Sequence, residues 1–198
     1  MHFKPVAQAL ADIVVVVSGL PRSGTSLMMA MLSAGGIPLL TDHQRPPDAD
    51  NPNGYFELEA IKRLSASAEC LATAPGKAVK IVAPLVFQLP LRFQYRIIFI
   101  ERNLDEVIAS QTAMLSRMGR QPALPADQLK AAFARQISRA RAILPQAGNQ
   151  EALFLQHREI LKDPCSAAEA VASFLQAELK LEAMAGIVNP ALHRQQVE

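Results

Sequence analysis

Tryptophan is absent from this chain of 198 residues, and aromatic residues of all kinds make up only 5% of it. Cysteine is scarce as well: Cys70 and Cys165 lie far apart and have no spacing typical of a zinc site or a redox pair. This scarcity excludes a disulfide-stapled scaffold and favours buried thiols in a reducing compartment. The sequence therefore predicts a core that forms without disulfides or a metal.

Long apolar runs are also missing. The longest apolar stretches fall well short of the roughly 20 residues that a membrane-spanning helix needs, and Met1–Pro5 lacks the layout of a signal peptide. The net charge of +2 is too small to favour nucleic-acid binding. We therefore expect a cytoplasmic protein that binds neither membrane nor nucleic acid. Because half of the residues are hydrophobic, residues 1–198 can form one domain with its own core.

Segments of strand length and of helix length alternate along the chain. The strand segments are Ile13–Val17, Ala78–Val82, Arg96–Ile100 and Ala152–Gln156, and the helical segments are Thr25–Ala34, Phe56–Ala72, Leu104–Met118, Ala126–Leu144 and Asp163–Leu175. This alternation predicts an α/β fold in which helices cover both faces of a central parallel sheet. The polar, proline-containing stretch 41–54 is too long for a plain connector, which predicts a functional lid or a mobile segment.

The first strand segment runs into a glycine loop that is followed by a helix. Gly19 and Gly24 bracket four residues, so the backbone N–H groups and the positive end of the helix can surround one bound anion. The position after Gly24 is Thr25, where a nucleotide-binding P-loop requires lysine, and the nearest cation is Arg22. Since that lysine reaches the β- and γ-phosphates, the sequence predicts a poor triphosphate enzyme.

Residues Gly19–Met28, which read Gly-Leu-Pro-Arg-Ser-Gly-Thr-Ser-Leu-Met, resemble the 5′-phosphosulfate loop of the sulfotransferases that use 3′-phosphoadenosine 5′-phosphosulfate. With arginine in place of lysine, the loop sequence is most similar to that of the protein-tyrosine sulfotransferases and their small bacterial relatives. The resemblance implies a loop that holds the 5′-phosphate and the sulfuryl group, with Arg22 also neutralising the bridging oxygen. The implied binding residues are Arg22, Ser23, Gly24, Thr25 and Ser26.

A second segment, Arg96–Ser110, resembles the same family. An apolar strand ends near Arg102, and Ser110 follows eight positions later, as in the 3′-phosphate site of sulfotransferases. A guanidinium can bind a phosphate through two N–H groups, and a helix hydroxyl can add a third hydrogen bond. Residues His157–Pro164 match a further family segment in part, with His157 in place of a tyrosine, and Asn51–Glu57 is similar to a loop of small bacterial relatives.

The sequence departs from the family at the catalytic base. In the cytosolic enzymes a Lys-Thr-His segment supplies a histidine, and Val82 stands at that position here, while Lys80 is retained. Lys80 is therefore expected to stabilise charge on the transferring group. The protein-tyrosine and heparan enzymes use a glutamate, so the resemblance implies Glu57 as the base, with Glu59 as second choice. The histidines His43 and His157 stay open as further candidates.

A second departure is the missing C-terminal Arg-Lys-Gly segment that closes over the 3′-phosphate in the cytosolic enzymes. Either Arg194 substitutes for it or the 3′ site is looser than usual.

Taken together, the resemblance implies transfer of a sulfuryl group from 3′-phosphoadenosine 5′-phosphosulfate to a hydroxyl or amine of a small molecule or peptide, by in-line displacement. No metal is expected, because arginine and lysine supply the positive charge. Two alternatives stay open: a nucleotide or metabolite kinase with a degenerate P-loop, which would bind ATP and Mg²⁺, and a nucleotide-binding module without catalysis. Homo-oligomerisation is compatible with the sequence and is also left open.

Overall fold

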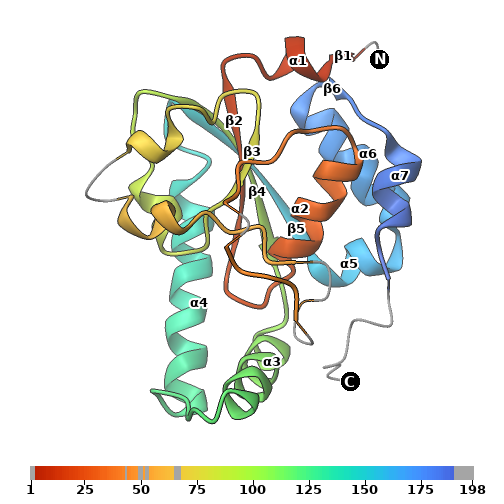
Figure 1. Cartoon of the computed structure of the whole chain (residues 1–198). Helices are drawn as coiled ribbons and strands as arrows, with labels where there is room; N and C mark the ends of the chain where they lie inside the picture. Colours follow the sequence, from red (N-terminus) through yellow and green to blue (C-terminus); the bar gives the residue numbers. More distant parts are fainter. Residues whose placement is uncertain (1–2, 43, 49–50, 52–53, 65–67, 190–198) are drawn as a thin grey trace.

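The computed structural model describes residues 3–42, 44–48, 51, 54–64 and 68–189. Its centre is a sheet of four parallel strands in the order β3-β2-β4-β5 (Figure 1). The strands are β2 (Ile13–Gly19), β3 (Ala78–Lys80), β4 (Gln94–Glu101) and β5 (Gln150–Gln156). The predicted α/β class with a parallel sheet is confirmed.

The strand order changes direction beside β2. The next strand in sequence, β3, lies on one side of β2, whereas β4 lies on the other side. In the register, Val17 is opposite Lys80, and Gly19 is opposite Ile100. Open parallel sheets bind ligands at the carboxyl ends of their strands, where the strand order changes direction. In this chain, that point is the loop after β2.

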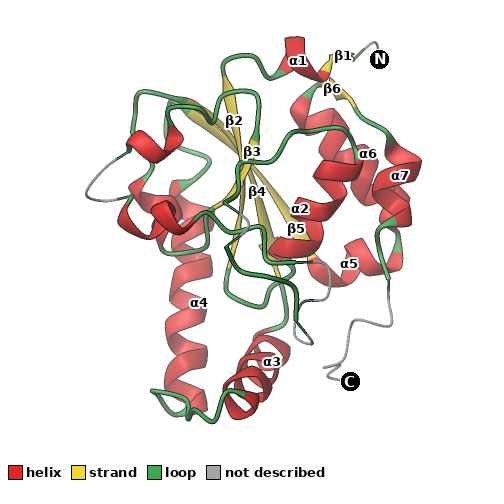
Figure 2. Cartoon of the chain, in the orientation of Figure 1, coloured by secondary structure: helices red, strands yellow, loops and turns green. Residues whose placement is uncertain are grey.

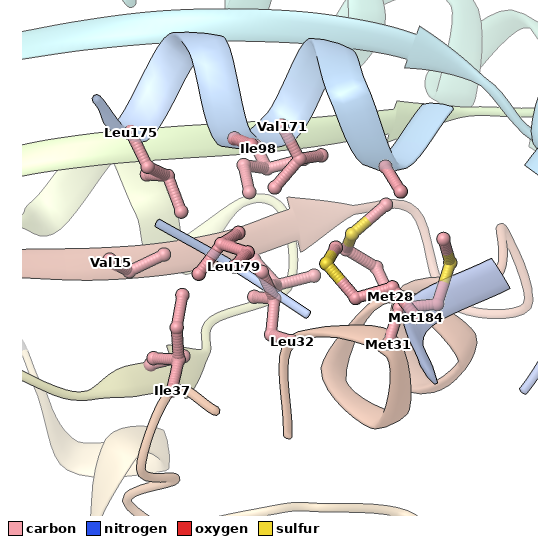
Figure 3. Close-up of a cluster of buried hydrophobic side chains, with 14 of the residues drawn as sticks. Val15, Met28, Met31, Leu32, Ile37, Ile98, Val171, Leu175, Leu179 and Met184 are labelled. Atoms are coloured by element: carbon pink, nitrogen blue, oxygen red, sulfur yellow. The ribbon is translucent and has the colours of Figure 1, made fainter. Parts of the chain in front are cut away.

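Alternate residues of β2 build the two halves of the core, because successive side chains of a strand point to opposite faces. Val15 and Val17 are fully buried in a cluster with residues of α2 (Thr25–Ala34), α6 (Pro164–Leu175) and α7 (Leu181–Gly186). Figure 3 shows part of this cluster, which contains Val15 and several methionines.

On the opposite face, Val14 and Val16 pack into a second cluster with residues of three short 3₁₀ helices and with the C-terminal part of α4 (Ala126–Ile143) (Figure 2). These 3₁₀ helices are η1 (Glu59–Arg63), η2 (Glu69–Leu71) and η3 (Leu85–Gln88).

Helices α3 (Leu104–Arg117) and α4 form a hairpin that extends away from the sheet below the loop after β2 (Figure 1). Asn103 caps α3, since its side-chain oxygen accepts from the backbone N–H of Asp105 at 2.8 Å. A small third cluster of Leu20, Val107 and Phe133 joins the hairpin to the loop. The hairpin thereby fixes the position of the residues at the start of α3.

A second, two-stranded parallel sheet lies beside α6 and α7. It pairs β1 (Lys4–Pro5) with β6 (Ala177–Glu178), and the short helix α1 (Val6–Ala9) follows β1. The remaining helix, α5 (His157–Lys162), begins directly after β5. None of the helices in the described part of the chain is long and apolar enough to cross a membrane.

The predicted helix at Phe56–Ala72 is wrong. Residues 54–58 have no helical structure, and only η1 and η2 form in this region, with residues 65–67 outside the described part. Phe56 has a φ of +51°, which an α-helix does not allow. The backbone carbonyl of Glu57 accepts hydrogen bonds from the Thr41 hydroxyl at 2.8 Å and from the Asp42 N–H at 3.2 Å. Tertiary hydrogen bonds therefore replace the helical ones. Strand β3 also ends earlier than predicted, at Lys80 instead of Val82.

Candidate functional site

The loop after β2 has the backbone conformation predicted for an anion cradle. Gly19 and Gly24 have φ values of +148° and +100°, and Arg22 between them also has a positive φ of +70°. A Cβ at Gly19 would come within 2.5 Å of the Ile100 carbonyl oxygen, and one at Gly24 would overlap the imidazole of His157. The loop backbone thus packs directly against β4 and α5. Helix α2 begins at Thr25, so its unpaired N–H groups and its positive end face the cradle.

The Ser23 hydroxyl lies inside this loop. Its oxygen is 2.5 Å from the position that a Gly19 Cβ would occupy. The side chain is fully buried, and within the described part of the chain no group forms a hydrogen bond with it. A buried polar atom without a partner is costly, so such an atom in a cradle of N–H groups fits a site that binds an anion.

Arg22, Arg102 and Ser110, which are distant in sequence, meet on the α3 side of the loop. Arg22 Nε donates to Ser110 Oγ at 3.1 Å, and Arg102 Nη1 donates to the backbone carbonyl of Arg22, also at 3.1 Å. Ser110 is buried on α3. The structure therefore brings together the residues that sequence reasoning assigned to the 5′ and 3′ ends of one ligand.

Glu106 belongs to this cluster and was missed. Its Oε2 lies 2.7 Å from Arg102 Nε, in an ion pair in which both side chains are about 90% buried. The spacing of four residues from Arg102 to Glu106 was the available signal, because side chains four apart on a helix are neighbours. The ion pair orients the guanidinium, because the Nε–H group is committed to Glu106.

Lys80 lies on the other side of the loop, at the end of β3. The residue is only 8% exposed. Its Nζ donates to the carbonyl oxygen of Tyr55 and to Ser26 Oγ, the latter at 3.3 Å, and lies 3.5 Å from Glu57 Oε1. Burial lowers the pKa of Lys80 from its ordinary 10.5 to about 8, while the carboxylate of Glu57 acts in the opposite direction. Lys80 is thus held between Ser26 of the loop and the segment that contains Tyr55 and Glu57.

Glu57 is bound from two sides. Besides Lys80, its Oε1 contacts Arg45 Nη1 at 3.4 Å, and its side chain is 31% exposed. The second-choice base, Glu59, forms an exposed ion pair with Lys62 at 2.7 Å. Of the two glutamates, Glu57 is the one that contacts the loop cluster through Lys80. Of the two histidines that were further candidates for the base, His157 is buried against Gly24, and His43 lies outside the described residues. Arg194, the candidate for the missing C-terminal segment, also lies outside them.

The segment predicted as a lid or mobile loop, 41–54, touches the site through several described residues. The Tyr55 hydroxyl, just beyond it, donates to both carboxylate oxygens of Asp48, at 2.8 and 2.7 Å, and the Arg45 guanidinium lies 3.3 Å from the centre of the Tyr55 ring. Burial, together with Asp48, raises the pKa of Tyr55 to about 12, so the hydroxyl keeps its proton. Asn51 donates to Ser26 Oγ at 2.9 Å. Sequence reasoning assigned no role to these four residues.

Acidic groups near the site do not gather as they would around a metal. Within the described ranges, no three His, Cys, Asp or Glu side chains lie close enough together to hold an ion. Glu101, the acidic residue that ends β4, accepts from Arg141 Nε at 2.8 Å and Nη2 at 2.7 Å, and from Gln156 Nε2 at 2.5 Å. Its carboxylate therefore connects the end of β4 to α4 and to the end of β5.

Comparison with known proteins relates this arrangement to one kind of fold. No protein-family profile matches the chain, and no curated sequence matches it. Solved structures do match. The sulfotransferase domain of the Synechococcus PCC 7002 olefin synthase superimposes with a TM-score of 0.60 at 16% identity, covering 100% of this chain and 90% of that domain. The sulfotransferase domain from the curacin biosynthetic pathway gives 0.56 at 12% identity, covering 93% and 91%.

Mouse sulfotransferase SULT7A1, solved in complex with PAP, gives a TM-score of 0.55 at 14% identity, covering 93% of this chain and 67% of the mouse protein. The fold is thus an α/β fold with a parallel central sheet. More narrowly, the chain has the fold of the sulfotransferases. The fold predicted from the resemblance is confirmed.

Proposed function

We propose that this protein is a sulfotransferase that uses 3′-phosphoadenosine 5′-phosphosulfate. The observation that carries the proposal is the meeting of Arg22, Arg102 and Ser110 beside the loop, with Lys80 on the opposite side of the same loop. Two positively charged regions flank one cradle of N–H groups, which suits a ligand that carries anionic groups at two places.

The residues around the loop carry the N–H groups, hydroxyls and guanidinium groups that bind phosphate and sulfuryl oxygens. Loop N–H groups, together with the buried hydroxyl of Ser23 and the hydroxyls of Thr25 and Ser26, would hold the 5′-phosphate and the sulfuryl group. Arg102 and Ser110 would hold the 3′-phosphate. Arg22, whose guanidinium already contacts Ser110, would offset charge on the bridging oxygen. The fold comparison supports this assignment, because one of the matching structures is a complex with PAP.

In the proposed mechanism, an acceptor hydroxyl or amine would attack the sulfur of the sulfuryl group in line. The S–O bond to the 5′-phosphate would break, and 3′-phosphoadenosine 5′-phosphate would leave. Lys80 stabilises negative charge that develops on the transferring group, which its buried position strengthens. Glu57 takes the proton of the acceptor. The ion pair between Glu57 and Lys80 places the two roles side by side. The proposed acceptor is a small molecule or a peptide, and the proposed setting is the cytoplasm, which the free thiols of Cys70 and Cys165 suit.

The kinase alternative is disfavoured by Glu101. A P-loop kinase needs an acidic residue at the end of a neighbouring strand to hold Mg²⁺, and the carboxylate at the end of β4 is instead occupied by Arg141 and Gln156. The non-catalytic alternative makes a different prediction: the co-substrate binds, but no acceptor is sulfated.

The proposal is tested by isothermal titration calorimetry with 3′-phosphoadenosine 5′-phosphate (PAP) and, separately, with ATP and Mg²⁺. We expect PAP to bind and ATP to bind far more weakly. A transfer assay with ³⁵S-labelled co-substrate and a panel of hydroxyl and amine acceptors follows. Binding of ATP alone, or of neither ligand, would refute the proposed function. Binding of PAP with no transfer to any acceptor, including a proteome-derived peptide mixture, would favour the non-catalytic module.

A further inference from the structure

The side chain of Asn51 reaches the anion loop from the segment that follows α2. Its Nδ2 donates to Ser26 Oγ at 2.9 Å and to the carbonyl oxygen of Gly54 at 2.6 Å. Ser26 is the second residue of α2 and one of the proposed co-substrate ligands. Asn51 is therefore in contact with the proposed binding site, although it is distant from the loop in sequence.

A compact turn holds Asn51 in this position. The Asn51 backbone N–H donates to Asp48 Oδ1 at 3.0 Å, and the Asn51 carbonyl accepts from the Gly54 N–H at 3.0 Å. Asp48 is in turn held by the Tyr55 hydroxyl. Both ends of the turn are thus fixed by hydrogen bonds, and the side-chain amide is oriented before any ligand binds. Preorganised donors of this kind are what anion stabilisation requires.

Two donors converge on the Ser26 hydroxyl. Asn51 Nδ2 reaches it at 2.9 Å and Lys80 Nζ at 3.3 Å. These donors lie on the Lys80 side of the loop, whereas Arg22 and Arg102 meet Ser110 on the α3 side. Because Lys80 and Ser26 are the groups assigned to the sulfuryl end of the ligand, a donor beside both of them faces that end as well.

We propose that Asn51 is a sulfuryl-binding residue, whose amide N–H moves from the Ser26 hydroxyl to an oxygen of the sulfuryl group when the co-substrate binds. This inference rests on the proposed function and deepens it. Asn51 adds a neutral donor next to the charged Lys80, so the sulfuryl group is recognised by geometry as well as by charge.

The test compares PAP, which lacks the sulfuryl group, with 3′-phosphoadenosine 5′-phosphosulfate in calorimetric titrations without acceptor. In Asn51→Ala we expect PAP affinity to stay within about twofold of the wild type, while affinity for the sulfated nucleotide falls about tenfold, the typical effect of one hydrogen bond to a charged group. In Asn51→Asp the loss should be larger, roughly a hundredfold, because a carboxylate repels the sulfuryl oxygens.

The matched control is Asn149→Ala. Asn149 Nδ2 also donates to a backbone carbonyl, that of Phe93, but the bond lies at the start of β4, away from the loop. This variant should bind both nucleotides as the wild type does. Thermal unfolding of each variant without ligand shows whether the turn is damaged; equal melting temperatures for Asn51→Ala and Asn149→Ala are expected within about 3 °C.

Unchanged affinity of Asn51→Ala for the sulfated nucleotide, or an equal loss for both nucleotides, overturns the inference. A wild-type protein that binds neither nucleotide refutes the proposed function itself, and this outcome is visible before any variant is made.

Discussion

Glu57 Oε1 lies 3.5 Å from Lys80 Nζ, at the carboxyl end of β3. The two groups have opposite tasks in the proposed reaction, since one accepts a proton and the other stabilises negative charge. The carboxylate of Glu57 raises the pKa of Lys80 and so opposes the effect of burial on that lysine. Both residues are therefore best tested through pH dependence as well as through rate.

Replacing Glu57 by glutamine should lower the pKa of Lys80 below its value of about 8. The carboxylate raises that pKa in the wild type and so opposes the effect of burial. The apparent pKa can be followed by NMR titration of selectively labelled lysine, with Lys80→Met used to assign the signal. Glu59→Gln is the matched control, because Glu59 pairs with Lys62. A Lys80 pKa that stays the same in both variants would contradict the ion pair.

Lys80 should make the unliganded protein more stable as pH rises from 8 to 10.5. Its folded-state pKa is about 8 and its ordinary value is 10.5, so between these values the unfolded chain binds more protons than the folded one. Stability then rises with pH. Relative to Lys80→Met, the free energy of unfolding should rise by at most about 3 kcal/mol across this window. This figure follows because each pKa unit is worth about 1.4 kcal/mol. Urea unfolding of both proteins at pH 7, 8, 9 and 10 measures the difference between their free energies of unfolding. Below about pH 7.5 this difference should not change with pH.

Replacing Arg102 by alanine should weaken PAP binding by roughly 10- to 100-fold, the cost of losing charge-assisted hydrogen bonds to a phosphate. The same change also removes the buried ion pair between Arg102 and Glu106, so a lower melting temperature is expected. Arg135→Ala removes an exposed arginine from α4 and should change neither quantity. Equal PAP affinities of the two variants in calorimetry would rule out Arg102 as a ligand.

Gly24→Ala should remove PAP binding, by a factor of 100 or more. A methyl group at this position overlaps the His157 ring, and a φ of +100° is strained for alanine by about 1–3 kcal/mol. Gly148→Ala is the control, since a Cβ there meets no atom within 4 Å. Adding His157→Ala to Gly24→Ala relieves the overlap but not the backbone strain, so the double variant should recover part of the binding. A Gly24→Ala protein with wild-type affinity would show that the loop does not need this geometry.

The sequence predicted the parts of the site that follow from local pattern. A buried strand, two glycines at a fixed spacing and a following helix imply a loop of one shape, and the structure has that loop at Gly19–Ser26. The Arg102–Ser110 pair likewise lies on a strand end and the helix after it, so its placement follows from the same alternation. These features depend on residues close together in the chain.

The segment around Asn51 and Tyr55 could not be predicted in the same way. The non-helical course of residues 54–58 depends on partners remote in sequence: Lys80 and Ser26 for the Tyr55 carbonyl, and Thr41 for that of Glu57. Helical propensity after Phe56 is overridden by these tertiary hydrogen bonds. The same holds for β1, whose two residues become a strand only because Ala177 and Glu178 lie alongside.

The pairing of β2 with β4 bears on how the protein becomes functional during its synthesis. The loop glycine Gly19 is aligned with Ile100, and the Ile100 carbonyl lies directly against it. The loop sequence leaves the ribosome early, but its supporting strand follows only about eighty residues later. The cradle is thus a late product of translation, so a nascent chain that ends before β4 lacks the wall against which the loop is shaped.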